Sequence, residues 1–403
     1  MLASLQDILD TVKSNTLTYQ QKLMCLGNIA ERLFDPRELL GYTDEEWQFL
    51  QNQMICDLNE GYAIYRPRYI LPDYNVYIKK GCEFLELPAP KNLDEALDGL
   101  LILYSHVPSI TTFPVYIGRL DMLLDPFITD EEQDYIKIKR FLNHVDKTVP
   151  DSFCHANIGP YDTKAGRLIL KAVIELEAPT PNMTIRYDKS KTSREFAELA
   201  AKACLLVSKP SFANDAYYIS DLGEQYGIAS CYNALPECGG AYTLTRLRLG
   251  TIARACKTVD EMVNELLPRV AKCALSTMDK RHKFVVEESN FFNTSFLEKE
   301  GFIKRTNFTG MFAIVGLADA ANHLLQQEGL NETFGKSQRG DEIATLIMDK
   351  LKEVTDNHEG VYAERTGNRY LLHAQVGASN HEEDKRNAPA HRIRVGEEPT
   401  LLA

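Results

Sequence analysis

The first 60 residues carry apolar side chains at the spacing of α-helices. Leu23, Ile29 and Leu33 follow this spacing, and Asn and Asp residues mark the breaks between the helical patterns. We therefore expect a helical N-terminal section over residues 1–60, followed by a second unit over residues 61–403. The second unit begins with GYAIYRPRYILPDYNVYI, in which prolines between aromatic residues favour an extended path over a continuous helix.

Further along the chain, helical patterns alternate with short segments that are bounded by proline or glycine. LDEALDGLLILYSH leads to SITTFPVYIG, TDEEQDYIKIKRFLNHV leads to SFCHANIGP, and TKAGRLILKAVIEL leads to NMTIRY. Parallel strands need helical crossovers, so this alternation predicts an α/β fold with mostly parallel strands. The periodicity does not distinguish a closed barrel from an open sheet.

After residue 240 the apolar spacing becomes strongly helical. The tail that starts at HAQVGASN is polar and irregular, as in a disordered segment or a truncated domain. We expect helices over YTLTRLRLGTIARAC, VDEMVNELLPRVAKCALSTMDKRHKF, GMFAIVGLADAANHLLQQ and DEIATLIMDKLKEVTDNH.

Composition and charge argue against several classes of function. With 44% hydrophobic and 25% charged residues over 403 positions, the chain is long enough to bury a large core. The formal net charge of -12 and the short basic clusters argue against nucleic-acid binding. The N-terminus lacks the features of a signal peptide, and the most apolar segment, GMFAIVGLADAANHLL, is too short to cross a bilayer. We expect a cytoplasmic protein without a membrane span.

The nine cysteines form no CxxC pair, so we expect reduced thiols and no zinc or iron–sulfur site. Cys231 lies in GIASCYNALPECGGAYTLTRL, a polar loop that contains glycines. As a nucleophile it would need a distant histidine such as His155 or His373. A disulfide with Cys238 is a second possible use, and radical chemistry in a loop shielded from water is a third.

The run KPSFANDAYYISDLGEQYGIASCYNALPECGGAYTLTRLRLG resembles the cysteine-loop region of glycyl radical enzymes, most closely that of the YjjI-type glycine radical enzymes. The similarity extends over nearly the whole chain. It includes EGYAIYRPRYILPDY, SITTFPVYIGRLDMLLDPF, DSFCHANIGPYDTKAGRLIL and VGASNHEEDKRNAPAHRI.

This resemblance implies a ten-stranded α/β barrel, in which helices surround two parallel five-stranded half-sheets and a cysteine finger meets a glycyl loop inside. It also implies a radical-SAM activating enzyme that creates a stored glycyl radical, with no other bound cofactor. Mapped onto this chain, Cys231 is the residue that forms a thiyl radical and abstracts hydrogen from a small organic substrate.

Three further residues of the loop are candidates for the site. Cys238 is an alternative thiyl residue, or a structural one. Glu237 is a general acid or base if burial raises its pKa, or else a solvated loop carboxylate. Asn233 orients a substrate, or is present because Asn favours turns.

A second polar stretch, FCHANIGPYDT, contains His155, Asn157 and Asp162 beside a glycine-proline turn. The resemblance suggests that these residues form a substrate-binding wall. Alternatively, Asp162 or Thr163 caps the next helix.

The family places its radical glycine in an Arg-Val-x-Gly-Tyr motif near the C-terminus, and this motif does not occur in the sequence. RIRVGEEP lacks both the spacer and the tyrosine. We therefore expect a C-terminally truncated member that requires a glycyl loop missing here: a gene fragment, the product of a premature stop, or one half of a split enzyme whose glycyl loop is a separate polypeptide. An incomplete barrel exposes a strand edge or an apolar cavity unless something covers it, so we also expect a homodimer.

Two alternative functions stay open. An anaerobic ribonucleotide reductase shares the barrel and the cysteine finger, although its N-terminal ATP-binding module and its late cysteine pairs are not found in this sequence. A non-catalytic scaffold that acts only through a partner would fit the missing glycine motif.

Overall fold

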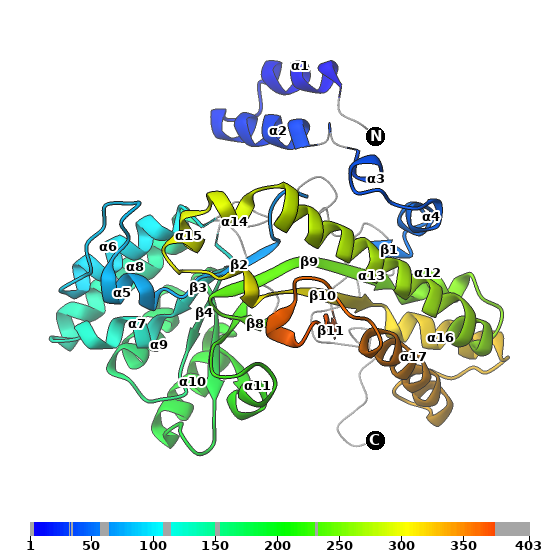
Figure 1. Cartoon of the computed structure of the whole chain (residues 1–403). Helices are drawn as coiled ribbons and strands as arrows, with labels where there is room; N and C mark the ends of the chain where they lie inside the picture. The colour runs from blue at the N-terminus through cyan, green and yellow to red at the C-terminus, as the bar shows by residue number, and fades with distance from the viewer. Residues whose placement is uncertain are drawn as a thin grey trace.

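Two sheets with helices packed around them form the body of the protein (Figure 1). Cys231 and the polar tail lie outside the described residues. The computed structural model describes residues 4–31, 33, 35–56, 64–107, 114–149, 154–229 and 233–374.

The N-terminal section is helical, as its apolar spacing predicts, and its helices begin at residues that cap them. Ser4 accepts a hydrogen bond from the backbone of Asp7, and Thr43 accepts one from the backbone of Glu46. Figure 1 shows the first two helices apart from the two sheets. The division of the chain at residue 60 stays a prediction. The helices are α1 (Leu5–Lys13), α2 (Tyr19–Glu31), α3 (Pro36–Leu39) and α4 (Asp44–Gln51).

A four-stranded parallel sheet follows, with the strand order β3-β4-β5-β6. Consecutive strands are connected by helices, as the alternating pattern predicts. The strands are β3 (Tyr116–Arg119), β4 (His155–Ile158), β5 (Asn182–Tyr187) and β6 (Ser211–Asn214). The helices of this half are α5 (Asn75–Lys80), α6 (Leu93–Tyr104), α7 (Leu120–Leu124), α8 (Glu131–Thr148), α9 (Lys164–Leu176), α10 (Arg194–Val207) and α11 (Asp215–Leu222).

The second sheet has five strands, of which β9, β10 and β11 are parallel, and β1 and β2 pair antiparallel with β9. The strands are β1 (Ile55–Cys56), β2 (Tyr69–Leu71), β9 (Gly239–Arg248), β10 (Phe308–Val315) and β11 (Leu371–Ala374). The helices of this half are α12 (Leu249–Arg254), α13 (Leu267–Lys283), α14 (Phe291–Thr294), α15 (Phe296–Lys299), α16 (Leu317–Gln327) and α17 (Gln338–Asp356).

A separate antiparallel hairpin, formed by β7 (Tyr226–Ala229) and β8 (Asn233–Pro236), lies between these two sheets in the sequence. The predicted α/β fold with two parallel sheets is confirmed. Within the described residues, parallel pairing joins four strands in one sheet and three in the other, where the resemblance implies five in each.

Two segments that the apolar spacing assigns to helices begin as strands. YTLTRLRLGTIARAC runs along β9 and becomes helical only at Leu249, and GMFAIVGLADAANHLLQQ runs along β10 before α16 starts at Leu317. Both strands are buried along their whole length. The helical prediction was wrong there. β10 is almost wholly apolar, as strands buried on both faces often are, whereas β9 alternates Thr and Arg with apolar residues, so a strand pattern was present in its sequence.

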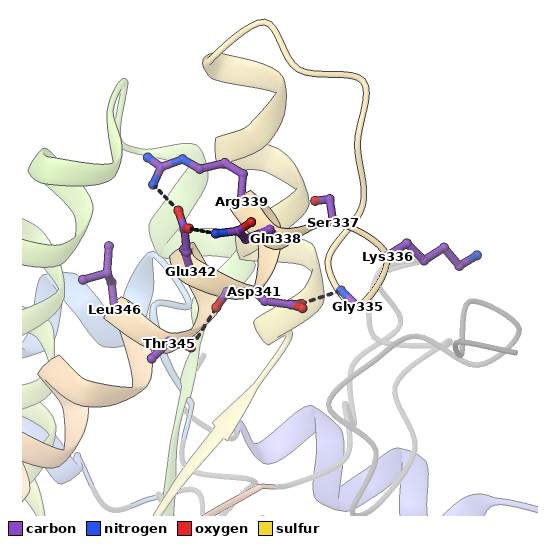
Figure 2. A pocket seen from close by; sticks show the side chains of 9 residues that line it. All are labelled: Gly335, Lys336, Ser337, Gln338, Arg339, Asp341, Glu342, Thr345 and Leu346. Carbon is purple, nitrogen blue, oxygen red and sulfur yellow. Dashed lines mark hydrogen bonds and ion pairs between the residues drawn. The ribbon is translucent and has the colours of Figure 1, made fainter. Parts of the chain in front are cut away.

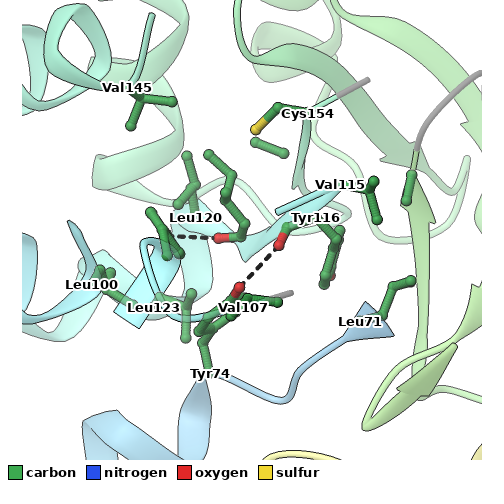
Figure 3. Close-up of a cluster of buried hydrophobic side chains, with 14 of the residues drawn as sticks. Leu71, Tyr74, Leu100, Val107, Val115, Tyr116, Leu120, Leu123, Val145 and Cys154 are labelled. Carbon is green, nitrogen blue, oxygen red and sulfur yellow. Dashed lines mark hydrogen bonds between the residues drawn. The ribbon is translucent and has the colours of Figure 1, made fainter. Parts of the chain in front are cut away.

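The main hydrophobic core packs α5 to α9 against the four-stranded sheet, and tyrosines tie the two layers together (Figure 3). The hydroxyl of Tyr74 donates a hydrogen bond to the carbonyl oxygen of Tyr116 at 3.0 Å. The hydroxyl of Tyr104 donates to the carbonyl oxygen of Ile117 at 2.8 Å, and the two tyrosine rings meet edge to face. These bonds fix β3 from one side, and β3 carries residues of the candidate site.

Gly240 lies where β2 pairs with β9, and the fit leaves no space for a side chain. Its φ is +149°, and a Cβ atom there would lie 2.0 Å from the backbone oxygen of Tyr69. We expect Gly240→Ala to lower the free energy of unfolding by about 1–3 kcal/mol or more, because the backbone must move. Urea unfolding measures this change.

Gly27→Ala is the matched control for that variant. Gly27 lies in α2, and a Cβ atom there would meet nothing within 4 Å. This substitution should leave the stability unchanged or raise it by about 0.5–1 kcal/mol. Equal effects of the two substitutions would contradict the close approach of β2 to β9 at Gly240.

Candidate functional site

The hairpin that flanks Cys231 packs on the four-stranded sheet, against β3 and β4. Its two strands pair from Tyr226 and Pro236 to Ala229 and Asn233. Residues 230–232 connect the strands, so Cys231 itself lies outside the described residues. Ala229 and Asn233 are both buried, and they define the two ends of the segment that contains Cys231.

Asn157 on β4 holds the outer edge of β7. Its Nδ2 atom donates to the carbonyl oxygen of Ile228 at 2.9 Å, and the backbone N–H of Ile228 donates to its Oδ1 atom at 2.8 Å. The side-chain amide thus replaces the peptide group of a neighbouring strand. Asn157 was predicted to line a substrate wall. In the structure, both ends of its side-chain amide are hydrogen-bonded to the backbone of Ile228 in the hairpin.

A buried ion pair holds the beginning of the same strand. The Nε atom of Arg186 donates to Oδ1 of Asp215 at 2.7 Å, and its Nη1 atom donates to the carbonyl oxygen of Tyr226 at 3.2 Å. The hydroxyl of Tyr226 also donates to Asp215, at 2.8 Å. Burial alone would raise the pKa of Asp215, but the hydrogen bonds from Arg186 and Tyr226 lower it. The carboxylate of Asp215 therefore compensates the positive charge of the Arg186 guanidinium.

Glu237 directly follows β8 and is buried, with only 8% of its surface exposed. Its Oε1 atom accepts a hydrogen bond from the hydroxyl of Tyr116 at 3.1 Å. Burial raises the pKa of Glu237 to about 7, the charge of Asp73 adds to this effect, and Arg119 opposes it. A carboxyl group with a pKa near neutrality is suited to transfer protons, which is the chemistry predicted for this residue if it is buried.

Two buried hydrogen-bond donors in this region have no partner among the described residues. One is Nδ2 of Asn233, a residue that is 7% exposed, and the other is Nε of Arg119. The Nη2 atom of Arg119 donates to the carbonyl oxygen of Gly159 at 3.0 Å, which holds the guanidinium near the end of β3. Buried polar groups are rarely left unpaired, so donors of this kind mark places for an acceptor atom.

Cys238 has the geometry of a structural residue. Its φ of +58° lies in the left-handed region, and its thiol points to the carbonyl oxygen of Gly301 at 3.7 Å. The backbone N–H of Lys304 donates to its carbonyl oxygen at 2.9 Å. Burial raises the pKa of the thiol to about 11. Cys238 is a free thiol.

The predicted substrate wall is brought together only in part. His155 is buried on β4, beside Tyr116 of β3 in the register of the sheet. Asp162 lies at the surface, where Nε of Arg167 donates to it at 2.6 Å and holds its pKa below the usual range. Thr163, and not Asp162, caps α9. The place of Asp162 in a substrate wall stays a prediction.

Arg119, Arg186 and Asp215 were not predicted as site residues from the sequence. A signal was present for Arg186, because it is the one charged residue of the predicted strand NMTIRY, and a buried arginine needs an ionic partner. The sequence did not indicate that this partner is Asp215.

A hollow of about 880 Å³ lies at the start of α17 (Figure 2). Polar groups in it bond to one another: the backbone N–H of Gly335 donates to Asp341 at 2.9 Å, and Arg339 lies 3.4 Å from Glu342. These groups already have partners.

Comparison with known proteins identifies the family. The family described as "Glycyl radical enzyme YjjI-like" matches residues 17–403. An uncharacterized protein of Haemophilus influenzae is 93% identical over 403 residues, which cover 100% of this chain and 78% of the relative. The uncharacterized protein YjjI of Escherichia coli is 42% identical over 391 residues, covering 96% of this chain and 74% of that protein.

The chain belongs to the YjjI-like glycyl radical enzyme family.

Solved structures show that the fold is shared beyond this family. An anaerobic ribonucleotide reductase from Thermotoga maritima superposes with a TM-score of 0.71 at 10% identity, covering 98% of this chain and 79% of that chain. Hydroxyproline dehydratase from Clostridioides difficile superposes with a TM-score of 0.63 at 11% identity, covering 99% of this chain and 75% of that chain. At such low identity these likenesses concern the fold alone.

Among the described residues of this YjjI-like protein, no group of three or more His, Cys, Asp or Glu side chains is arranged to hold a metal ion. No helix within the same residues combines the length and the apolar character that a membrane span requires.

The raised pKa of Glu237 makes stability depend on pH. The pKa rises from 4.5 to about 7 on folding, so the folded protein keeps a proton that the unfolded chain releases between these pH values. The stability from this group is fully present below about pH 4.5 and is lost as the pH rises through about 7. Glu237→Gln should remove this loss, which amounts to at most about 3 kcal/mol.

Urea unfolding of both proteins at pH 4 and pH 8 measures this difference. Burial raises the pKa of Asp121 to about 6. Asp121 titrates in both proteins, so its contribution to the pH dependence cancels when the two are compared. Glu132→Gln, an exposed glutamate on α8, is the control and should leave the pH dependence as it is. If Glu237→Gln and the wild type differ equally at both pH values, Glu237 does not carry the raised pKa.

Proposed function

We propose that this chain provides the hydrogen-abstracting half of a glycyl radical enzyme site, with Cys231 as the thiyl residue. The observation that carries this proposal is the fixed hairpin: its turn contains Cys231, and Glu237, a buried carboxyl group with a pKa of about 7, follows its second strand. Family membership supports the radical chemistry.

The proposed relay moves one hydrogen atom at a time. A glycyl radical, when present, supplies the unpaired electron. Cys231 gives the hydrogen atom of its thiol to the glycine Cα, and its sulfur then takes a hydrogen atom from a substrate carbon. This restores the thiol and leaves the unpaired electron on the substrate. The thiol needs no lowered pKa, because no thiolate takes part.

Glu237 and the unpaired donors act on the substrate in this proposal. With a pKa near 7, Glu237 gives or accepts the proton that accompanies bond cleavage. Asn233 Nδ2 and Arg119 Nε bind an oxygen atom of the substrate and orient it. Buried His155 contributes to the wall of the site. The substrate is therefore a small organic molecule that carries an oxygen acceptor.

The proposal includes partners. A radical-SAM activating enzyme generates the glycyl radical on the glycine of an Arg-Val-x-Gly-Tyr motif. We also propose a homodimer.

Electron paramagnetic resonance tests the radical chemistry. The chain is incubated anaerobically with a matching activating enzyme, with and without a polypeptide that carries Arg-Val-x-Gly-Tyr. We expect a glycyl doublet only when the polypeptide is present. The absence of a doublet under both conditions would contradict a catalytic function and favour the alternative of a non-catalytic scaffold.

Deuterated buffer then identifies the relay cysteine. A thiol exchanges its hydrogen with solvent, so relay through it places deuterium on the glycine and collapses the doublet to a singlet. We expect the collapse in the wild type and in the control Cys238→Ala, but not in Cys231→Ala. The opposite assignment of the two variants would make Cys238 the thiyl residue.

A further inference from the structure

We propose that Asn157 is a positioning residue, whose side-chain amide sets the place of β7 and thereby of the segment that contains Cys231. The inference rests on the proposed function for the role of Cys231 only. The hydrogen bonds between Asn157 and Ile228 are properties of the fold.

The hairpin needs an anchor because its two strands pair only with each other within the described residues. A two-stranded hairpin has little stability of its own. In a strand, the N–H and C=O groups of residues i and i+2 point to the same edge. Tyr226 and Ile228 are such a pair, and Arg186 and Asn157 bind their outward-facing carbonyl oxygens.

The contact at Ile228 specifies the register more strictly than the contact at Tyr226. Asn157 binds both the N–H and the C=O group of one residue, as a neighbouring strand does. Arg186 presents only donors, so it binds carbonyl oxygens and carboxylates. Ile228 is also closer to Cys231, which follows it by three positions in the sequence.

Close packing beneath β7 removes the space for an alternative position. A Cβ atom on Gly227 would lie 2.7 Å from the ring of Tyr116. The same ring carries the hydroxyl that donates to Glu237. The strand and the carboxyl group are thus both placed against one tyrosine, and Asn157 keeps β7 in the register where this holds.

A small displacement matters for the proposed relay. A slip of one residue would move the strand by about 3.3 Å. Reacting atoms must approach to about 3–3.5 Å for efficient transfer. A hairpin one residue out of register would therefore stop hydrogen transfer even if the protein were fully folded.

The first test follows the hairpin itself and requires no radical. Hydrogen–deuterium exchange with mass spectrometry is measured on peptides that cover β7 and β8. In Asn157→Ala we expect exchange there to accelerate roughly tenfold or more, because the backbone N–H of Ile228 loses its acceptor. Alkylation of Cys231, read from the same peptides, should accelerate in parallel.

Two further variants keep the test decisive. Asn157→Asp retains an acceptor for the Ile228 N–H but loses the donor to its carbonyl oxygen, so its exchange should be intermediate. Thr184→Val is the matched control. Thr184 lies beside Asn157 in the register of β4 and β5, is buried, and its hydroxyl has no partner among the described residues. It should leave exchange and alkylation unchanged.

The second test separates this inference from the proposed function. In activated Asn157→Ala we expect the glycyl doublet to form but its collapse in deuterated buffer to slow roughly tenfold or more. A wild type without any doublet contradicts the proposed function, and the exchange and alkylation rates then decide the inference alone. Unchanged exchange in Asn157→Ala, or an unchanged collapse rate beside a normal doublet, overturns the positioning role.

Discussion

The outer edge of β7 imposes the constraint on which the site depends. This strand is buried, and buried backbone N–H and C=O groups must have hydrogen-bond partners. Side chains on β4 and β5 supply these partners, since no further strand lies there among the described residues. These side chains can bond to the N–H and C=O groups of β7 only when the strand is in one register. The hydrogen bonds that the backbone of β7 requires therefore also fix the position of the hairpin.

The same arrangement explains the charge state of the region. Arg186 is neutralised by Asp215, to which it is directly bonded, so its charge compensates Glu237 only weakly. Arg119 opposes the effect of burial on Glu237 without cancelling it, and the pKa of that carboxyl stays near 7. Burial thus outweighs the two arginines, and Glu237 both holds and releases a proton near neutral pH.

The sequence predicted much of the fold because local patterns suffice for a sheet with helical crossovers. Segments such as NMTIRY and HANI lie between amphipathic helices, and they form strands where the alternation places them. The prediction failed at β10, which is buried on both faces and carries no alternating pattern, and at β9, whose alternation of Thr and Arg with apolar residues was assigned to a helix. The YjjI-like family was also readable from sequence, because its motifs extend along the whole chain.

By itself, the sequence determined the α/β class, the family and the loop that contains Cys231 and Glu237. Only the tertiary structure decided what the polar residues do. A carboxyl group shifts its pKa according to burial and neighbouring charges, and an asparagine binds whatever its fold brings within 3 Å, as Ile228 does at 2.8 and 2.9 Å. Asn157, Arg186 and Asp215 are distant from Cys231 in the chain, and no local pattern encodes that they meet around one hairpin.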